Sequence, residues 1–322
     1  NWEEALIGSR LRWTPDRIRM GTLFTRRDRK SFRYEQIMAR PGDSAVTPTA
    51  SPVEALETTA QVDFQPLEAV TAEVTFISVR DLLSPQDAIQ DPRIHQVLRE
   101  ERTGLGPLDL GWETNRALRT RLGLRPSLAS WLRTDLSLAT DYTSDRNAAL
   151  VEELVVGMDT LLVIQRNANG NRTTRATASL DPGALARSVG GSRGQETQPA
   201  GVARLLQVID PIFISRQGGL SARFFREAVN PGAGFQFGLG SRDALRFLNG
   251  DTASVFTGQT TWAGGTGVRL PFNLRVTGNF SDSRTQVLHV RSDRELWTRT
   301  WPDIRVILSQ VELPESVGRV IF

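Results

Sequence analysis

The chain has 322 residues, of which 39% are apolar, and its 39 basic and 36 acidic residues leave a formal net charge of +3. This length suits one large domain or two ordinary ones, and the near balance of charge excludes a strong field of one sign. The chain contains no cysteine, which excludes disulfides, thiolate catalysis and cysteine-based zinc sites.

Helical membrane proteins are also excluded, because no stretch reaches the roughly 18 consecutive apolar residues that a spanning helix needs. Strand-built membrane proteins are not, since their alternating strands average to a polar composition. Lys30 is the only lysine, so 39 − 1 = 38 of the basic residues are arginines. Codon bias in a GC-rich genome is the favoured explanation, and selection for bidentate guanidinium contacts is the alternative. No leader precedes Asn1, so either a targeting segment was removed or the chain is part of a longer one.

The first predicted element is a hairpin, because residues 5–13 and 18–24 both alternate apolar and polar side chains around a proline turn at 14–16. Residues 26–33 are a charged loop or strand extension, and residues 40–60 are a flexible excursion. The same alternation predicts further strands, and Pro271 marks a break in one of them. These strands are expected at 62–64, 70–76, 131–142, 235–239, 268–280 and 304–308.

Helices are predicted between these strands. Residues 86–101 favour a helix that Pro92 kinks or splits. Residues 147–165 are rich in Ala, Leu and Glu, which favours a helix. Short amphipathic helices are expected at 200–208 and 219–228. The polar, glycine-rich stretch 187–201 is predicted to link an N-terminal region, 1–186, to a C-terminal region, 202–322.

The fold class that follows is mainly β: antiparallel hairpins, forming part of a barrel or an open sheet or sandwich, with short helices and long loops.

No catalytic constellation is found, and the sequence predicts no enzyme, cofactor or metal site. His95 and His289 lack the spacing of metal ligands, which favours surface or interface positions. The adjacent glutamate pairs 3–4, 100–101 and 152–153 point in different directions. The glycine-rich stretch 264–267 has no following Lys-Ser/Thr, so it predicts a hairpin turn and not a phosphate loop.

Two sets of residues are candidate contacts. For the basic run a solvated hairpin tip is favoured; anionic lipid or lipopolysaccharide is the next choice, and nucleic acid is disfavoured by the charge balance. The tryptophans near strand ends fit either a membrane interface or a buried sandwich core. The basic run is Arg26, Arg27, Arg29, Lys30 and Arg33, and the candidate interfacial aromatics are Trp13, Trp131, Trp262, Trp297 and Trp301.

Four segments resemble recurring elements of the SprA family of outer-membrane translocons of the type 9 secretion system. Residues 302–322 are similar to a proline-led strand followed by a hydrophobic segment. Residues 230–250 resemble a Pro-Gly turn, an aromatic strand and a short helix. Residues 132–142 and 274–284 are similar to barrel strands of that family. The resemblance covers about half of the chain and implies no catalytic residues, and the chain would be a fragment or short relative.

Three functions remain open. The first is a non-catalytic structural or transport component of the bacterial envelope, in the outer membrane or periplasm, with other envelope or membrane proteins as partners and anionic lipid as a candidate ligand. The second is an accessory structural subunit docked on the periplasmic side of a large membrane complex, for example a respiratory or photosynthetic one. The third is a soluble β-sandwich enzyme acting on glycans, which would need two converging carboxylates. No small-molecule substrate and no nucleic acid is expected.

Overall fold

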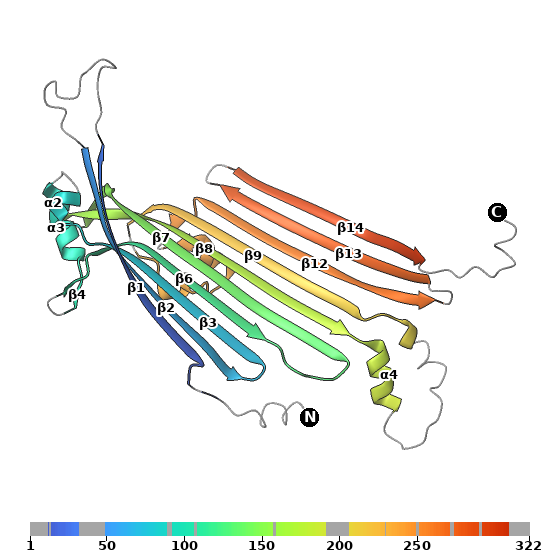
Figure 1. Ribbon diagram of the computed structural model, residues 1–322. Helices are drawn as coiled ribbons and strands as arrows, with labels where there is room; N and C mark the ends of the chain where they lie inside the picture. Colours follow the sequence, from blue (N-terminus) through green and yellow to red (C-terminus); the bar gives the residue numbers. More distant parts are fainter. Residues whose placement is uncertain are drawn as a thin grey trace, which may run out of the picture.

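A computed structural model gives the fold as one large antiparallel sheet with a few short helices (Figure 1). The mainly β prediction is therefore confirmed. The structure describes residues 12, 14–31, 49–88, 92–105, 108–156, 159–190, 206–228, 230–248, 251–270, 274–289 and 292–308.

The main sheet has ten strands in the order β1-β2-β3-β6-β7-β8-β9-β12-β13-β14. Each strand pairs antiparallel with the next long strand of the chain, which is the simplest topology that consecutive hairpins allow. Within the described residues, β1 and β14 end this order. The strands are β1 Arg17–Ser31, β2 Thr49–Leu67, β3 Val70–Asp81, β6 Trp112–Leu124, β7 Leu132–Val156, β8 Asp159–Leu180, β9 Ile212–Glu227, β12 Val255–Leu270, β13 Leu274–His289 and β14 Ser292–Leu308.

Short elements fill the connections. Figure 1 shows α2 and α3 at one end of the strands and α4 at the other. Two-stranded ribbons are formed by β4 with β5 and by β10 with β11. The short elements are α2 Pro85–Ala88, α3 Pro92–Glu101, β4 Gly104–Leu105, β5 Leu108–Asp109, α4 Pro182–Gly190, α6 Ala233–Gln236, α7 Arg242–Arg246, β10 Phe247–Leu248 and β11 Asp251–Thr252.

Period-two alternation predicted most of these strands correctly. The stretches 18–24, 62–64, 70–76, 132–142, 274–280 and 304–308 all lie in strands of the main sheet. The helical stretch 86–101 is confirmed over its described residues, because α2 contains 86–88 and α3 contains 92–101; α3 begins at Pro92, where the missing N–H costs nothing. The strand predicted at 5–13 lies outside the described residues.

Two helix predictions were wrong. Residues 147–156 belong to β7, residues 159–165 belong to β8, and residues 219–227 belong to β9. Their helix-favouring composition is a weak preference that strand pairing overrides. In β9 the apolar phase consists of Leu220, Ala222 and Phe224, which pair with residues of β8 and β12.

Two predictions about short segments were also wrong. The stretch 235–239 begins in helix α6, and its chain reverses at Gly238, whose φ of 62° favours glycine. The glycines of 264–267 form no turn but lie inside β12. A side chain at Gly264 would overlap the ring of Phe280 on the neighbouring strand. Glycine is used there because another side chain occupies the space above the strand.

The predicted linker 187–201 is described only over residues 187–190, which lie in α4. The strands on either side of it, β8 and β9, pair from Leu180 with Ile212 to Arg166 with Glu227. The main sheet is therefore continuous between the two predicted regions.

A small cluster anchors α3 to the sheet. Ile94 and Leu98 of α3 are buried against Trp112, Ala148 and Ile164 of three strands. This cluster holds α3 against the sheet where β6 begins, beside β7 and β8.

Beside this cluster, Asp109 gives a testable pH dependence. Burial alone would raise the pKa of this carboxyl, but the N–H of Gly111 at 2.8 Å and the Arg102 guanidinium at 2.8 Å outweigh it, so the pKa is lowered. A lowered folded-state pKa stabilises the fold above the unfolded-state pKa, and this contribution is lost as the pH falls through the folded-state value.

Asp109→Asn is therefore expected to lower the free energy of unfolding at pH 7 by about 0.5 to 1 kcal/mol, a small effect because the side chain is 57% exposed. The difference from the unchanged protein should shrink towards zero in acid. Urea titrations at several pH values measure it. An equal difference at neutral and acidic pH would contradict the assignment.

Candidate functional site

The two faces of the main sheet differ in chemistry. Residues directly opposite each other in an antiparallel pair point to the same side. One row of such partners consists mainly of apolar residues, and we call its side the apolar face. The row is Met20, Ala60, Phe76, Leu118, Tyr142, Gly170, Ala222, Phe256 and Leu288.

The opposite side, the polar face, carries Thr, Ser, Asn, Gln and charged residues. Ion pairs connect neighbouring strands across it, with only scattered exposed apolar side chains such as Leu23, Phe213 and Leu296. Apart from the two pairs made by the buried Asp210, these pairs join exposed or half-exposed groups and each stabilises little, but they indicate a face that contacts water. The pairs are Arg17–Asp63, Arg121–Glu73, Arg119–Asp141, Arg125–Asp135, and Arg269 and Arg275 with Asp210.

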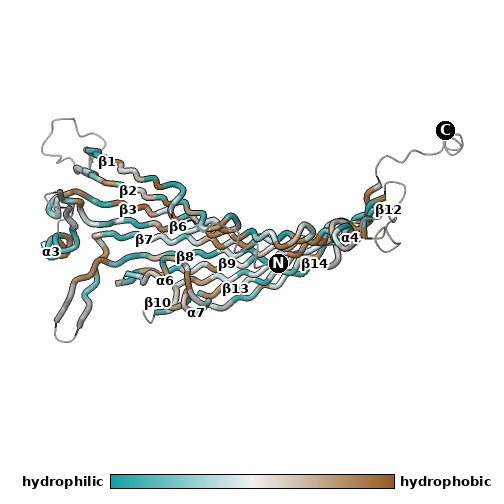
Figure 2. Tube along the Cα trace, turned by 90° about the horizontal axis from the view of Figure 1, so that it is seen from below, coloured by the Kyte–Doolittle hydropathy of each residue, from teal (hydrophilic) through white to brown (hydrophobic). Residues whose placement is uncertain are grey.

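One part of the apolar face is covered by α6 and α7, which lie together on one side of the sheet (Figure 2). Phe235 of α6 packs edge-on against Tyr142 and Phe224, with ring centroids 6.0 and 5.5 Å apart. Leu245 and Leu248 complete this core with Phe256 of β12. The α6–α7 segment thus closes the apolar face over β7, β8, β9 and β12 near its middle.

The rest of the apolar face is uncovered in this chain, and we call it the apolar band. Met20 is 79%, Ile214 49% and Val306 62% exposed. An uncovered apolar surface of this kind marks contact with lipid or another protein. Its exposed members are Ile18, Met20, Leu122, Leu124, Leu136, Ile212, Ile214, Leu270, Ile304 and Val306, and its partly buried members are Val70, Leu132, Leu138, Leu180, Val268, Leu274 and Val276.

The apolar band crosses the strands obliquely. The row of directly opposite residues that starts at Met20 on β1 ends at Leu288 on β13. The apolar band on β13 is centred on Val276 instead, which is 288 − 276 = 12 residues from Leu288 along the strand. Twelve residues span about 40 Å along a strand, and the eight steps from β1 to β13 span about 38 Å across the sheet. The strands are therefore inclined at about 45° to the normal of the band.

The inclination is uniform across the sheet. On β7, four steps from β1, the partner row of Met20 reaches Tyr142, and the band centres six residues away on Leu136. On β9, six steps from β1, the row reaches Ala222 and the band centres eight residues away on Ile214. The offsets of 6 residues in four steps, 8 in six and 12 in eight are about 1.3 to 1.5 residues per strand, so the band crosses these strands at a nearly constant angle.

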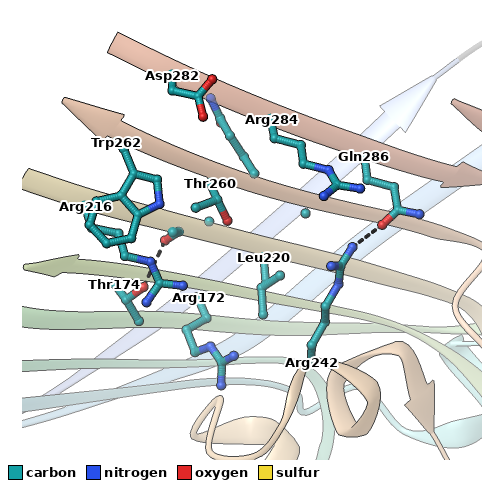
Figure 3. A pocket seen from close by; sticks show the side chains of 14 residues that line it. Arg172, Thr174, Arg216, Leu220, Arg242, Thr260, Trp262, Asp282, Arg284 and Gln286 are labelled. Carbon is teal, nitrogen blue, oxygen red and sulfur yellow. Dashed lines mark hydrogen bonds between the residues drawn. The ribbon is translucent and has the colours of Figure 1, made fainter. Parts of the chain in front are cut away.

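A pocket lies on the apolar face between the band and the α6–α7 segment, and we call it the arginine pocket (Figure 3). It has a volume of about 520 Å³, and four guanidinium groups surround it. They come from four separate elements, β8, β9, α7 and β13. The four are Arg172, Arg216, Arg242 and Arg284.

The sequence did not predict this pocket. Only Trp262 belongs to both the predicted candidates and the pocket lining. The sequence contains one indication of the pocket. Arg172 and Arg216 stand at strand positions whose side chains point to the apolar face, where an uncompensated charge is unusual. On β9 these positions were not recognised, because residues 219–228 were predicted to form a helix.

The predicted basic run is only partly described. Arg26 is exposed and pairs with Glu54 on β2 at 3.0 Å, and Arg27 is exposed. Arg29 and Lys30 lie in β1, but their side chains are outside the described residues, as is the whole of Arg33. The structure therefore does not test a shared site for these five.

The predicted aromatics do not gather at one place. Trp131 is half-buried just before β7, and Trp262 lies under the Arg216 guanidinium, 5.5 Å from it. Trp297 is exposed, and its Nε1 donates to Asp282 at 2.7 Å. Trp13 and the side chain of Trp301 lie outside the described residues.

No family model matches the chain, and no curated protein matches it. Among the described residues, no helix has the length and apolar character needed to cross a membrane. In the same residues, His, Asp and Glu form no group of three that could hold a metal ion.

Proposed function

We propose that the chain is a non-catalytic component of a bacterial envelope, namely a section of a membrane wall in which the apolar band contacts lipid and the polar face borders water. The resemblance to outer-membrane translocons led to the same expectation. A structural or transport role follows, because such a wall separates two compartments or lines a passage between them.

The oblique apolar band is the observation that carries the proposal. Strands that cross a bilayer are inclined by about 35 to 45° and alternate between a lipid side and a water side. The inclination of about 45° derived from the register falls at the upper end of that range. In a sheet that packs against a folded core, the apolar positions are not expected to move along the strand by a similar number of residues at each step to the next strand.

Strand length supports the same function. A strand needs about 9 to 11 residues to cross a bilayer. The ten strands of the main sheet have between 12 residues in β3 and 25 in β7. They are long enough to cross and to extend into water on either side.

The edges of the sheet fit a section of a larger wall. Within the described residues, β1 and β14 each pair with one neighbour only. Unpaired backbone groups are costly in hydrocarbon, so membrane strands must find partners on both sides. In the proposed function, further strands of the envelope assembly pair with these two edges.

The test is the depth of single spin labels in the full chain reconstituted into phosphatidylcholine vesicles. The absence of native cysteine makes each introduced cysteine unique. Labels at Met20, Leu136, Ile214 and Val276 are expected to be accessible to oxygen, shielded from a water-soluble nickel chelate, and at one common depth. The matched polar-face positions Gly21, Ser137, Ser215 and Thr277 should show the opposite preference. Equal access of the nickel chelate to both sets would contradict the proposal.

A further inference from the structure

We infer that the arginine pocket binds the phosphate group of an anionic lipid, whose acyl chain lies in the adjoining apolar groove. The phosphate chemistry stands on the pocket alone, whereas the lipid as its source rests on the proposed function.

The pocket carries uncompensated positive charge. Among the described residues only Arg284 of the four has a carboxylate partner, Glu295. Arg172 donates to the carbonyl oxygens of Gly238 and Gly240, at 3.2 and 2.5 Å. Arg242 donates to the side-chain oxygen of Gln286. These acceptors are neutral, so they orient the guanidinium groups without cancelling their charge.

Arg216 is the most available of the four. Its guanidinium lies 5.5 Å from the centre of the Trp262 ring, and the side chain is exposed. The one acidic residue of the lining, Asp282, is held by Trp297 at 2.7 Å and by Arg299 at 3.3 Å. Planar guanidinium groups form paired hydrogen bonds to phosphate oxygens, so such a cluster fits phosphate better than a single lysine would.

Glycines make room for the ligand. Gly218 and Gly258 lie on β9 and β12 in the lining of the pocket. A Cβ at Gly258 would lie 3.1 Å from the guanidinium of Arg242, and a Cβ at Gly218 would lie 2.7 Å from the hydroxyl of Thr174. Side chains at these positions would fill the floor of the hollow.

An apolar groove of about 410 Å³, the leucine groove, adjoins the arginine pocket. The two share Thr174 and Arg216 in their linings. Polar and apolar compartments joined in this way match a phosphate with an attached acyl chain, and a soluble anion would not need the groove. The groove is lined by Val70, Leu122, Leu124, Leu136, Leu138 and Ala176 together with neighbouring backbone and polar atoms.

The position of the pocket relative to the band also fits a headgroup. On β13, Arg284 is eight residues from Val276, about 19 Å from the band centre along the band normal. On β9, by contrast, Arg216 is two residues from Ile214, about 5 Å in depth, so its long side chain has to extend towards the boundary. The arginines therefore lie on the side of the band that faces the α6–α7 segment. Arginine and tryptophan side chains are favoured at this boundary between hydrocarbon and water.

The experiment is native mass spectrometry of the full chain in a neutral detergent, with three probes: dioleoyl phosphatidic acid, dioleoylglycerol and inorganic phosphate. The lipid with a phosphate is expected to bind, and dioleoylglycerol is expected to bind at least about tenfold more weakly. Arg216→Gln with Arg242→Gln should reduce binding of phosphatidic acid about tenfold or more. The matched control, Arg133→Gln with Arg223→Gln, removes two exposed arginines of the polar face and should change it less than about twofold.

The single variant Arg216→Gln is the control for misfolding, because the Arg216 side chain is exposed and its replacement is not expected to disturb the fold. It should weaken binding by itself while circular dichroism stays unchanged. Equal binding of phosphatidic acid by all variants would overturn the phosphate site. Binding of inorganic phosphate as tightly as the lipid, with the same loss in the variants, would keep the phosphate chemistry and overturn the lipid. These outcomes are read in detergent and are independent of the depth measurement that tests the proposed function.

Discussion

Leu136→Arg is expected to destabilise the chain in a bilayer by about 2 to 4 kcal/mol, the cost of a charged side chain on the lipid side near the middle of the membrane. Leu136 lies at the centre of the apolar band and is 43% exposed in this chain. Guanidinium unfolding of the chain in phosphatidylcholine vesicles, followed by tryptophan fluorescence, measures the loss.

Ser137→Arg is the matched control, because Ser137 is the next residue of β7 and points to the polar face. It should cost less than about 0.5 kcal/mol, as expected for a surface change. The same two variants in lipid-free detergent should differ far less than in the vesicles. Equal losses at both positions in the bilayer would contradict lipid contact by the apolar face.

Much of the sheet could be predicted because alternation is a local property. Residues 274–280 keep a strict period of two, and residues 18–24 keep it apart from Leu23, a pattern that only a strand can place on one side. Residues 147–165 failed because their composition favours a helix while their pairing partners, which decide the outcome, are distant in sequence. Residues 235–239 failed for the opposite reason: their period of two is accidental, and glycine at 238 lets the chain turn back over the sheet.

The arginine pocket could not be predicted from one sequence. Its four arginines are spread from residue 172 to residue 284 and meet only through the register of β8, β9, β12 and β13 with α7 above them. Register depends on how every hairpin turns, and turn geometry is not determined by the pattern of the strands alone. Once a strand is correctly predicted, the sequence does show an arginine at one of its otherwise apolar positions, and such a residue indicates a candidate site.

The second large effect is expected at Phe235, where Phe235→Ala should lower the free energy of unfolding by about 3 to 5 kcal/mol. The ring fills the space between the sheet and α6, against Tyr142 and Phe224. It also lies directly over Gly170, where a Cβ would be 3.0 Å from it. The neighbouring backbone cannot move in to fill the cavity left by the ring. Both the lost contacts and the cavity therefore lower the free energy of unfolding.

Phe225→Ala is the matched control, since this phenylalanine of β9 is 52% exposed and should cost less than about 1 kcal/mol. Chemical denaturation of the full chain in detergent measures both changes. Because Gly238, Gly240 and Arg242 all follow Phe235 in the α6–α7 segment, loosening that segment should also release Arg172 and weaken phosphatidic acid binding. A Phe235→Ala chain that unfolds as the unchanged protein does would show that α6 is not anchored by this ring, and that the pocket does not depend on it.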